Sequence, residues 1–228
     1  MDLSSFESIC GVHFTNKDLL MQSFVHRSYL NENPSFRLDH NERLEFLGDA
    51  VLELVVTDYL YRQYSHPEGE LTMWRAALVN AKILGQIAEK LSMADYMLLS
   101  HGEKKDIGRS RPIILANAIE AFIGALYLDQ GYDVTSLFIH THIIPELPSI
   151  IDRKTYKDAK SMFQEMAQDR RGMTPHYTVL KEWGLDHDKH FRMGVFLGET
   201  QEGEGEGVSK QEAQQEAAKD ALHKLAWE

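Results

Sequence analysis

The sequence predicts a mainly α-helical protein with two parts, an all-α domain over residues 1–147 and a small α+β domain over residues 158–228. Apolar residues recur at helical spacing up to about Pro145, and no convincing strand interrupts them. In the second part, strand-like runs stand between two helical ones. With 228 residues and 43% hydrophobic content, the chain is long enough for two cores.

Amphipathic runs place the helices of the first domain. We expect helices over residues 17–31, 41–64, 70–79, 80–91, 112–129 and 132–144. The run PELPSIIDRKTYK then brings two prolines close together, and proline ends helices because it lacks an N–H and clashes with the preceding turn. We therefore place a linker over residues 148–157.

The second domain is expected to follow the order α-β-β-β-α. A helix is predicted over 158–171, and strands over 176–182 and 191–197 are separated by the turn-rich GLDHDK. The glycine-rich QEGEGEG predicts a short third strand at best. Ser209 then caps the last helix, and Glu212, three residues later, completes a predicted capping box.

Cysteine use and the N-terminus bear on the compartment. Cys10 is the single cysteine, which excludes an internal disulfide and suits a reducing cytosol. The segment MDLSSFESIC has neither the basic start nor the apolar centre of a signal peptide. The apolar run over 113–128 is too short and too interrupted for a membrane span. We expect a cytoplasmic protein with no membrane contact and no disulfide partner.

The net charge of −11 argues, taken alone, against nucleic-acid binding, because Lys and Arg make the phosphate contacts. Net charge is nevertheless a poor guide to a local patch. The loop HGEKKDIGRSRP, between predicted helices, carries four basic residues, Lys104, Lys105, Arg109 and Arg111. This loop fits a phosphate-contacting rim and a solvated connection equally well.

The most informative stretch is HNERLEFLGDAVLEL, over residues 40–54. On a helical wheel Glu42, Glu45 and Asp49 fall within roughly 60°. A solvated polar face is the ordinary explanation of such a pattern. Here, however, the lysines that usually pair with an acidic face four residues on are absent, and Phe46 projects on the same side. An exposed phenyl ring at that place needs a partner surface.

A second helical run, IILANAIEAFIGALYL, is apolar nearly all round and should lie in the core. A buried, ionised glutamate there must meet a cation or become protonated. Asn117 and Glu120 are three residues apart and point the same way. Facing the first acidic wedge, they would form an oxygen-rich pocket suited to Mg²⁺ or Mn²⁺. The alternative is a structural Asn–Glu hydrogen-bonded pair.

These motifs resemble a known family. HNERLEFLGDAVL is similar to the signature of the bacterial ribonuclease III family, and three flanking blocks match in the family's order: LLMQSFVHRSYLNENP, PEGELTMWRAALVN and ILANAIEAFIGALYLDQG. The second domain resembles the double-stranded RNA-binding domain through FQE, DHDKHF and GEGVSKQEAQQEAA. The resemblance covers essentially the whole chain.

The resemblance implies an endoribonuclease that hydrolyses double-stranded RNA with Mg²⁺, for which Mn²⁺ can substitute. It implies a homodimer that leaves 5′-phosphate and 3′-hydroxyl ends on ribosomal RNA precursors and some mRNAs. Glu45, Asp49 and Glu120 would be the catalytic metal ligands, with Asn117 as the fourth metal contributor. Glu42 and Glu68 would lie toward the substrate or the partner subunit. Phe46 would anchor the dimer in a pocket of the second copy.

The RNA-binding residues implied by the resemblance are Gln164, Glu165, His187, Lys189, Ser209 and Lys210. Shape readers of this kind contact two minor grooves and the phosphates between them. Two departures weaken the expectation, since Gln211 and Gln214 stand where basic residues are common. Residues 158–228 carry nine Lys and Arg against fourteen Asp and Glu, a net charge of −5. Binding by this domain alone should therefore be weak.

Asn117 is the main departure in the nuclease domain, because the family usually has aspartate there. Asparagine keeps an oxygen for Mg²⁺ but loses a charge and cannot act as a base. We expect retained cleavage because Glu45, Asp49 and Glu120 remain. The alternatives are a cleavage-attenuated or inactive RNA-binding dimer, a substitution at 117 engineered to trap an uncleaved complex, and a helical phosphohydrolase of small molecules.

Overall fold

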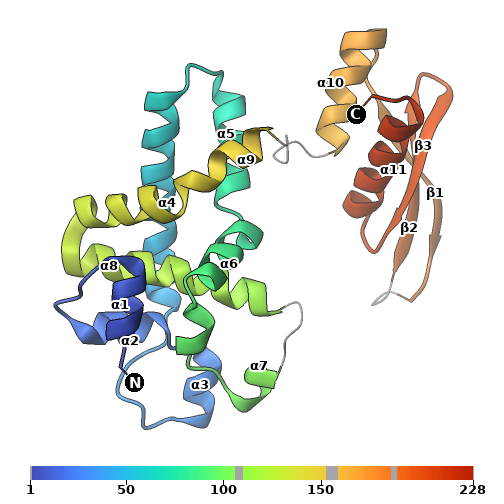
Figure 1. Cartoon of the computed structure of the whole chain (residues 1–228). Coiled ribbons are helices and arrows are strands. Elements are labelled where there is room, and N and C mark those ends of the chain that lie inside the picture. The colour runs from blue at the N-terminus through green and yellow to red at the C-terminus, as the bar shows by residue number, and fades with distance from the viewer. Residues whose placement is uncertain (1, 106–109, 153–158, 186–188, 228) are drawn as a thin grey trace. The chain divides into compact units, whose positions relative to one another are not determined.

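The computed structural model describes residues 2–105, 110–152, 159–185 and 189–227. The chain divides into two compact units, Met1–Tyr156 and Lys157–Glu228 (Figure 1). The first unit is built from helices, and the second places two helices against a three-stranded sheet. This agrees with the predicted fold class, a mainly α-helical chain with an all-α domain before a small α+β domain.

The first unit contains α-helices and short 3₁₀ segments. Their bounds are α1 Ser4–Cys10, α2 Lys17–Ser23, α3 Arg27–Glu32, α4 Glu42–Gln63, α5 Glu68–Leu78, α6 Ala81–Lys90, η1 Met93–Tyr96, α7 His101–Lys105, α8 Ser110–His142, η2 Ile144–Glu146 and α9 Leu147–Asp152. The described residues of this unit include no strand, only an isolated parallel bridge between Val25 and Leu98.

That bridge explains why the predicted helix over 17–31 is two helices. The amide of His26 donates to the carbonyl of Leu98 (3.1 Å), and the amide of Leu98 donates to the carbonyl of Phe24 (2.9 Å). These long-range bonds hold Phe24 to His26 between α2 and α3, so tertiary pairing overrides the helical periodicity. Three further α-helices were not predicted: α1, α7 within the expected basic loop, and α9 at the expected linker.

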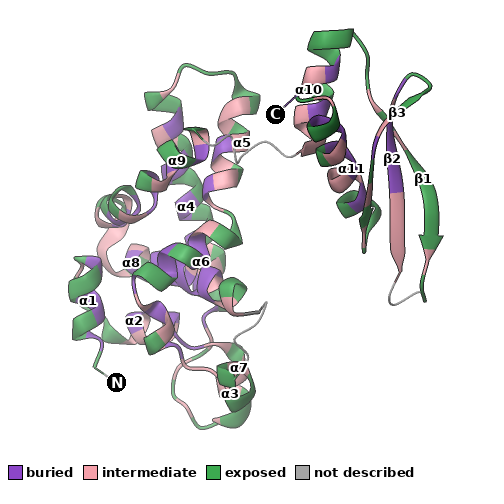
Figure 2. Cartoon of the chain, turned by 45° about the vertical axis from the view of Figure 1, so that its right-hand side comes forward, coloured by how far each residue is buried: buried purple, intermediate pink, exposed green. Residues whose placement is uncertain are grey.

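The core of the first unit lies around α8, which is purple along most of its first half in Figure 2. Phe6 meets Phe24 and Phe122 edge to face, with ring centroids 4.9 and 5.3 Å apart. Cys10 is buried here, and burial raises the pKa of its thiol to about 12, which keeps it protonated. Gly131 interrupts the helical backbone of α8 with φ 78° and ψ −173°, as the two separately predicted runs require.

One helical stretch among the described residues is long and apolar enough to cross a membrane by length and composition. It is Arg111–Asp152, and 56% of its most apolar window is buried inside the protein. The helical run is therefore longer than the sixteen residues considered from the sequence. A core helix passes the same test, so the stretch is weak evidence for a membrane span.

Helix α9 begins the region that the sequence assigned to a linker. Leu147 and Ile150 are buried in the core of the first unit, and that unit extends to Tyr156. The two prolines of this region are tolerated because Pro145 lies at the start of η2 and Pro148 in the first turn of α9. The predicted first domain therefore gains a final helix.

The second unit has the predicted order. It consists of α10 Ala159–Arg171, β1 His176–Trp183, β2 His190–Leu197, β3 Thr200–Gly207 and α11 Lys210–Lys224, with an antiparallel sheet in the order β1-β2-β3. Phe163 and Trp227 stack in its core with centroids 5.7 Å apart. The Ser209 Oγ accepts from the Glu212 amide (3.1 Å), so the predicted cap forms. The Glu212 carboxylate accepts from the Val208 amide (2.9 Å), one residue before the N-cap.

Strand β3 is a full strand of eight residues, longer than the sequence indicated. Its alternating glycines lie under α11: a Cβ on Gly203 would stand 2.5 Å from the Ala217 carbonyl oxygen, and one on Gly205 would stand 2.2 Å from the Ala217 nitrogen. The glycines are therefore required for close packing of helix on strand. Their low strand propensity concealed a strict two-residue alternation.

Candidate active site

The candidate site lies where α4 crosses α8, at a very close helix contact. A Cβ on Gly48 would stand 1.7 Å from the carbonyl oxygen of Glu120, and one on Gly124 would stand 2.1 Å from that of Leu44. Neither position accepts a larger residue without moving a helix. The two glycines therefore bring the acidic face of α4 up to the side chains of α8.

This contact gathers Glu45 and Asp49 of α4 with Glu120 of α8. Burial, followed by the charges of Asp49 and Glu45, raises the pKa of Glu120 to about 7. Burial, followed by Glu42 and Asp49, also raises the pKa of Glu45. In the described part of the chain, none of these three carboxylates has an ion pair or hydrogen bond. The result is a concentration of negative charge without a resident counter-charge.

Asn117 lies half-buried on α8, one turn before Glu120. No hydrogen bond joins the Asn117 amide to the Glu120 carboxylate among the described residues. The structural Asn–Glu pair that the sequence left open is therefore not observed. The amide instead remains available as a neutral oxygen donor beside the carboxylates.

The donor set fits a hard divalent cation in chemical type, because Mg²⁺ takes carboxylate and amide oxygens. Unpaired carboxylates close enough to raise each other's pKa also favour a cation electrostatically. The described residues include no group of three or more His, Cys, Asp or Glu side chains already positioned around one ion. The predicted ligands are thus neighbours that are not closed into a coordination shell.

Glu42, the third carboxylate of the predicted wedge, lies beside two basic side chains, Arg27 and His40. Its carboxylate lies 3.5 Å from Nη1 of Arg27 and 3.7 Å from Nδ1 of His40. It still contributes charge to Glu45, one turn along α4. Glu42 therefore lies at the edge of the acidic cluster, between it and a cationic group.

Phe46 is 81% exposed on α4, as the sequence predicted for a side chain without a partner in its own chain.

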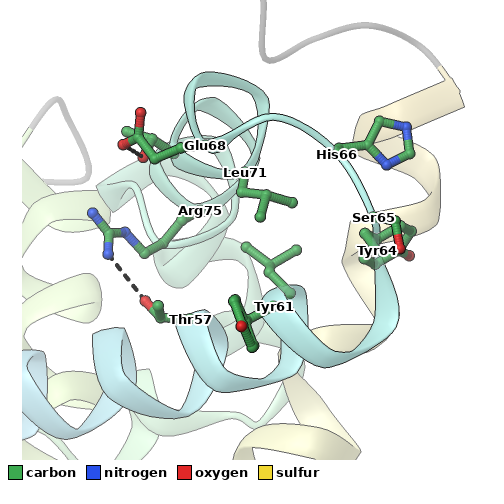
Figure 3. A pocket seen from close by; sticks show the side chains of 10 residues that line it. Thr57, Tyr61, Tyr64, Ser65, His66, Glu68, Leu71 and Arg75 are labelled. Atoms are coloured by element: carbon green, nitrogen blue, oxygen red, sulfur yellow. Dashed lines mark hydrogen bonds between the residues drawn. The ribbon is translucent and has the colours of Figure 1, made fainter.

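At the opposite end of α4, a pocket of about 670 Å³ lies between that helix and α5 (Figure 3). Tyr61 and Leu71 line it, and Arg75 donates to Thr57 Oγ1 (3.0 Å) on one wall.

Glu68 lines the same pocket rather than the acidic cluster. Its carboxylate accepts a hydrogen bond from Thr72 Oγ1 (2.9 Å) in the first turn of α5. The chain itself therefore does not bring Glu68 together with Glu45 and Asp49.

The residues predicted to contact RNA lie in the second unit. Gln164 and Glu165 are exposed on α10, and the Lys210 ammonium stands 5.7 Å from the centre of the Phe191 ring. Lys189 forms an ion pair with Glu182. Ser209 is the N-cap of α11, as the sequence predicted. His187 and the loop residue Arg109 lie outside the described residues.

Several contributors were missed in the sequence. Lys160 on α10 reaches α11, where its Nζ donates to Gln214 Oε1 (2.8 Å). Arg27, beside Glu42, lies in the matched block LLMQSFVHRSYLNENP without having been singled out. Gly48 and Gly124 were visible as glycines in strongly helical runs, which is a sign of close packing. Of the loop cations, Lys104 and Lys105 are exposed on α7 and Arg111 is half-buried on α8.

Comparison with known proteins agrees with this architecture. Residues 16–147 match the Ribonuclease-III-like family, and residues 159–225 match the Double-stranded RNA binding motif. The chain is 45% identical to Ribonuclease 3 of Oceanobacillus iheyensis over 226 residues, 99% of each chain. It is 42% identical to Ribonuclease 3 of Borreliella afzelii, over 96% of this chain and 90% of that one.

Among solved structures, the nuclease domain of the Campylobacter jejuni enzyme superposes with a TM-score of 0.58 at 37% identity. The match covers 64% of this chain and 99% of that domain. The family models match both units, and the relatives match nearly the full length of the chain. The acidic site at the α4–α8 crossing and the α-β-β-β-α unit therefore belong to the same family architecture. The chain belongs to the ribonuclease III family of endoribonucleases, with a nuclease domain followed by a double-stranded RNA-binding domain.

Proposed function

We propose that this protein cleaves double-stranded RNA by metal-dependent hydrolysis of phosphodiesters, leaving 5′-phosphate and 3′-hydroxyl ends. The observation that carries the proposal is the group of unpaired carboxylates, Glu45, Asp49 and Glu120, at the α4–α8 crossing. Ribosomal RNA precursors and some mRNAs in the cytoplasm are the proposed substrates, because a shape reader accepts any sufficiently long duplex.

The chain's own residues divide the work. Glu45, Asp49 and Glu120 would hold Mg²⁺, or Mn²⁺ in its place, and Asn117 would add a neutral oxygen. Bound there, the ion would supply an activated water and stabilise charge on the phosphate and the leaving oxygen. Glu120 must lose its proton before it can serve as a ligand. Asn117 would contribute its amide oxygen as a ligand but could not act as a base.

A homodimer would complete the site, and an exposed stripe on α4 supports it. Phe46, Leu54 and Tyr61 are exposed apolar residues that fall within roughly 80° on the helix. If two copies of α4 pack antiparallel about Leu54, Phe46 of one copy reaches the Tyr61 end of the other, where the pocket opens. Glu68 of that pocket would then approach the partner's acidic cluster. The Campylobacter jejuni nuclease domain likewise has a region involved in dimer formation.

A labelled RNA duplex incubated with and without Mg²⁺ and resolved on a denaturing gel tests the function. We expect cleavage only with Mg²⁺ or Mn²⁺, and loss of cleavage but not of binding for Glu120→Gln. Binding without cleavage at any concentration of either ion would instead establish the inactive RNA-binding dimer. A chain that does not bind the duplex would revive the small-molecule phosphohydrolase.

A further inference from the structure

Arg27 is an exposed cation at the edge of the acidic cluster, and its pairing with Glu42 does little for stability. The two side chains are 69% and 47% exposed, and the closest approach, from Nη1 to Oε1, is 3.5 Å. Exposed pairs of this kind contribute little to stability, because water screens the charges. The guanidinium is therefore free to exchange its partner at small cost.

The backbone nevertheless fixes Arg27 relative to α4. The buried Asn41, directly before α4, donates from its amide to the carbonyl of Val25 (2.9 Å) and from Nδ2 to that of Ser23 (3.0 Å). The bridge between Val25 and Leu98 secures the same segment on its other side. The backbone next to Arg27 is therefore in place beside α4 before RNA binds, and only the Arg27 side chain has to change its partner.

The neighbouring helix α7 carries two more exposed cations. Helices α3 and α7 lie side by side (Figures 1 and 2), joined by a bond from the Ser100 amide to Ser28 Oγ (3.1 Å) and by the His101–Glu32 pair (2.9 Å). Lys104 and Lys105 are exposed on α7. Arg27 therefore lies at the edge of the acidic cluster, and the adjacent helix α7 adds the exposed Lys104 and Lys105 together with Glu103.

We propose that Arg27 binds a phosphate of the scissile RNA strand next to the phosphate that is cleaved, and exchanges Glu42 for it. Glu42 lies only one helical turn, about 4.5 Å along the axis, from Glu45. The phosphates that flank the reacting one must therefore approach carboxylates that repel them. A guanidinium at this edge offsets the repulsion and can grip two phosphate oxygens at once. The inference rests on the proposed cleavage of RNA at Glu45, Asp49 and Glu120.

The salt dependence of binding tests this contact. We would measure duplex affinity by fluorescence anisotropy in Mg²⁺ across a series of salt concentrations, in the full chain carrying Glu120→Gln. Adding Arg27→Gln should weaken binding about five- to tenfold and reduce the log–log salt slope by about one, the effect of losing one phosphate contact. Arg27→Lys should keep most of the slope.

Lys90→Gln is the control, because Lys90 is also well exposed (62%) and paired with an acidic residue, Glu146. Lys90 ends α6, and neither it nor Glu146 lies on α4 or lines the pocket proposed to receive the partner. Its loss should leave the slope unchanged. Glu42→Gln should tighten binding more when Arg27 is present than with Arg27→Gln, because the released guanidinium adds to the relief of repulsion.

Equal slopes for Arg27→Gln and Lys90→Gln would overturn the proposed contact while leaving the nuclease function standing. Cleavage by the Glu120→Gln parent would overturn the proposed active site itself, which separates the two failures. Melting temperatures should be the same for all variants. A large loss of stability with Arg27→Gln would contradict the exchangeable surface pair.

Discussion

Glu120 is the residue on which the pH behaviour of the site depends. Its folded pKa of about 7 lies above the ordinary value of 4.5. The folded state therefore binds more protons than the unfolded state between these values. Without a divalent ion, the stability contributed by protonated Glu120 is fully present below pH 4.5 and is lost as the pH rises through 7. Water screens the half-exposed cluster, so the loss is on the order of 1 kcal/mol.

We therefore expect the metal-free melting temperature to fall between pH 5 and pH 8, and this part of the fall to be absent in Glu120→Gln. Metal binding displaces the same proton. The Mg²⁺ concentration that gives half-maximal cleavage should accordingly decrease from pH 6 to pH 8. Calorimetry in EDTA and a Mg²⁺ titration of the cleavage rate provide the two measurements. A Mg²⁺ requirement independent of pH would contradict the role of Glu120.

Asn117 determines how strongly the site attracts its ion. Asn117→Asp adds one charge beside Glu120, so it should lower the Mg²⁺ concentration for half-maximal cleavage roughly tenfold, equivalent to about 1.4 kcal/mol. The same change should raise the pKa of Glu120 further, because like charges oppose ionisation. Cleavage rates of both proteins over a Mg²⁺ series measure the effect. The hypothesis of retained activity fails if the chain with Asn117 does not cleave in Mg²⁺ or Mn²⁺.

At the scale of elements, the crossing of α4 and α8 depends on Gly48. A methyl group there would collide with the Glu120 carbonyl, so Gly48→Ala should destabilise the fold by about 3 kcal/mol or more and abolish cleavage. Gly69→Ala in α5 is the control, because nothing lies within 4 Å of its added Cβ. That change should be neutral or stabilising by up to about 1 kcal/mol. Urea denaturation distinguishes the two, and equal stabilities would contradict the packing argument.

Helix α11 explains one of the two missing basic residues. Gln214 is occupied with Lys160, so a lysine at 214 would set two ammonium groups against each other. Gln211 is exposed in the first turn of α11. Gln211→Lys should therefore tighten duplex binding several-fold and steepen the salt slope by about one, while Gln214→Lys should gain less. Anisotropy titrations of both variants measure the difference, and an equal gain at both positions would contradict the Lys160 contact.

Across the whole molecule, local patterns predicted elements well but long-range contacts poorly. The acidic wedge and the buried run of α8 indicated the site because both are periodic within one helix. The break at Val25 could not be foreseen, since it depends on pairing with Leu98, far along the chain. The extent of β3 was missed because Gly203 and Gly205 are selected by the alanines of α11 rather than by strand propensity. Arg27 became a candidate only once the fold brought it to Glu42.

The assembly of two chains is the last step toward a complete site. Phe46 is too exposed to contribute to the stability of its own chain, so Phe46→Ala should leave the monomer fold intact. Removing the Phe46 ring from the pocket of each partner should weaken dimerisation by about 2–4 kcal/mol per ring. The cleavage rate per protein molecule should then decrease on dilution, because Glu68 would no longer reach the partner's cluster. Sedimentation velocity from nanomolar to micromolar concentrations measures the shift. Leu137→Ala, at another exposed apolar position on α8 (67% exposed), is the control that should dimerise normally. A Phe46→Ala protein that remains dimeric at the lowest concentration would place the interface elsewhere, and Glu68 would then have to act within its own chain.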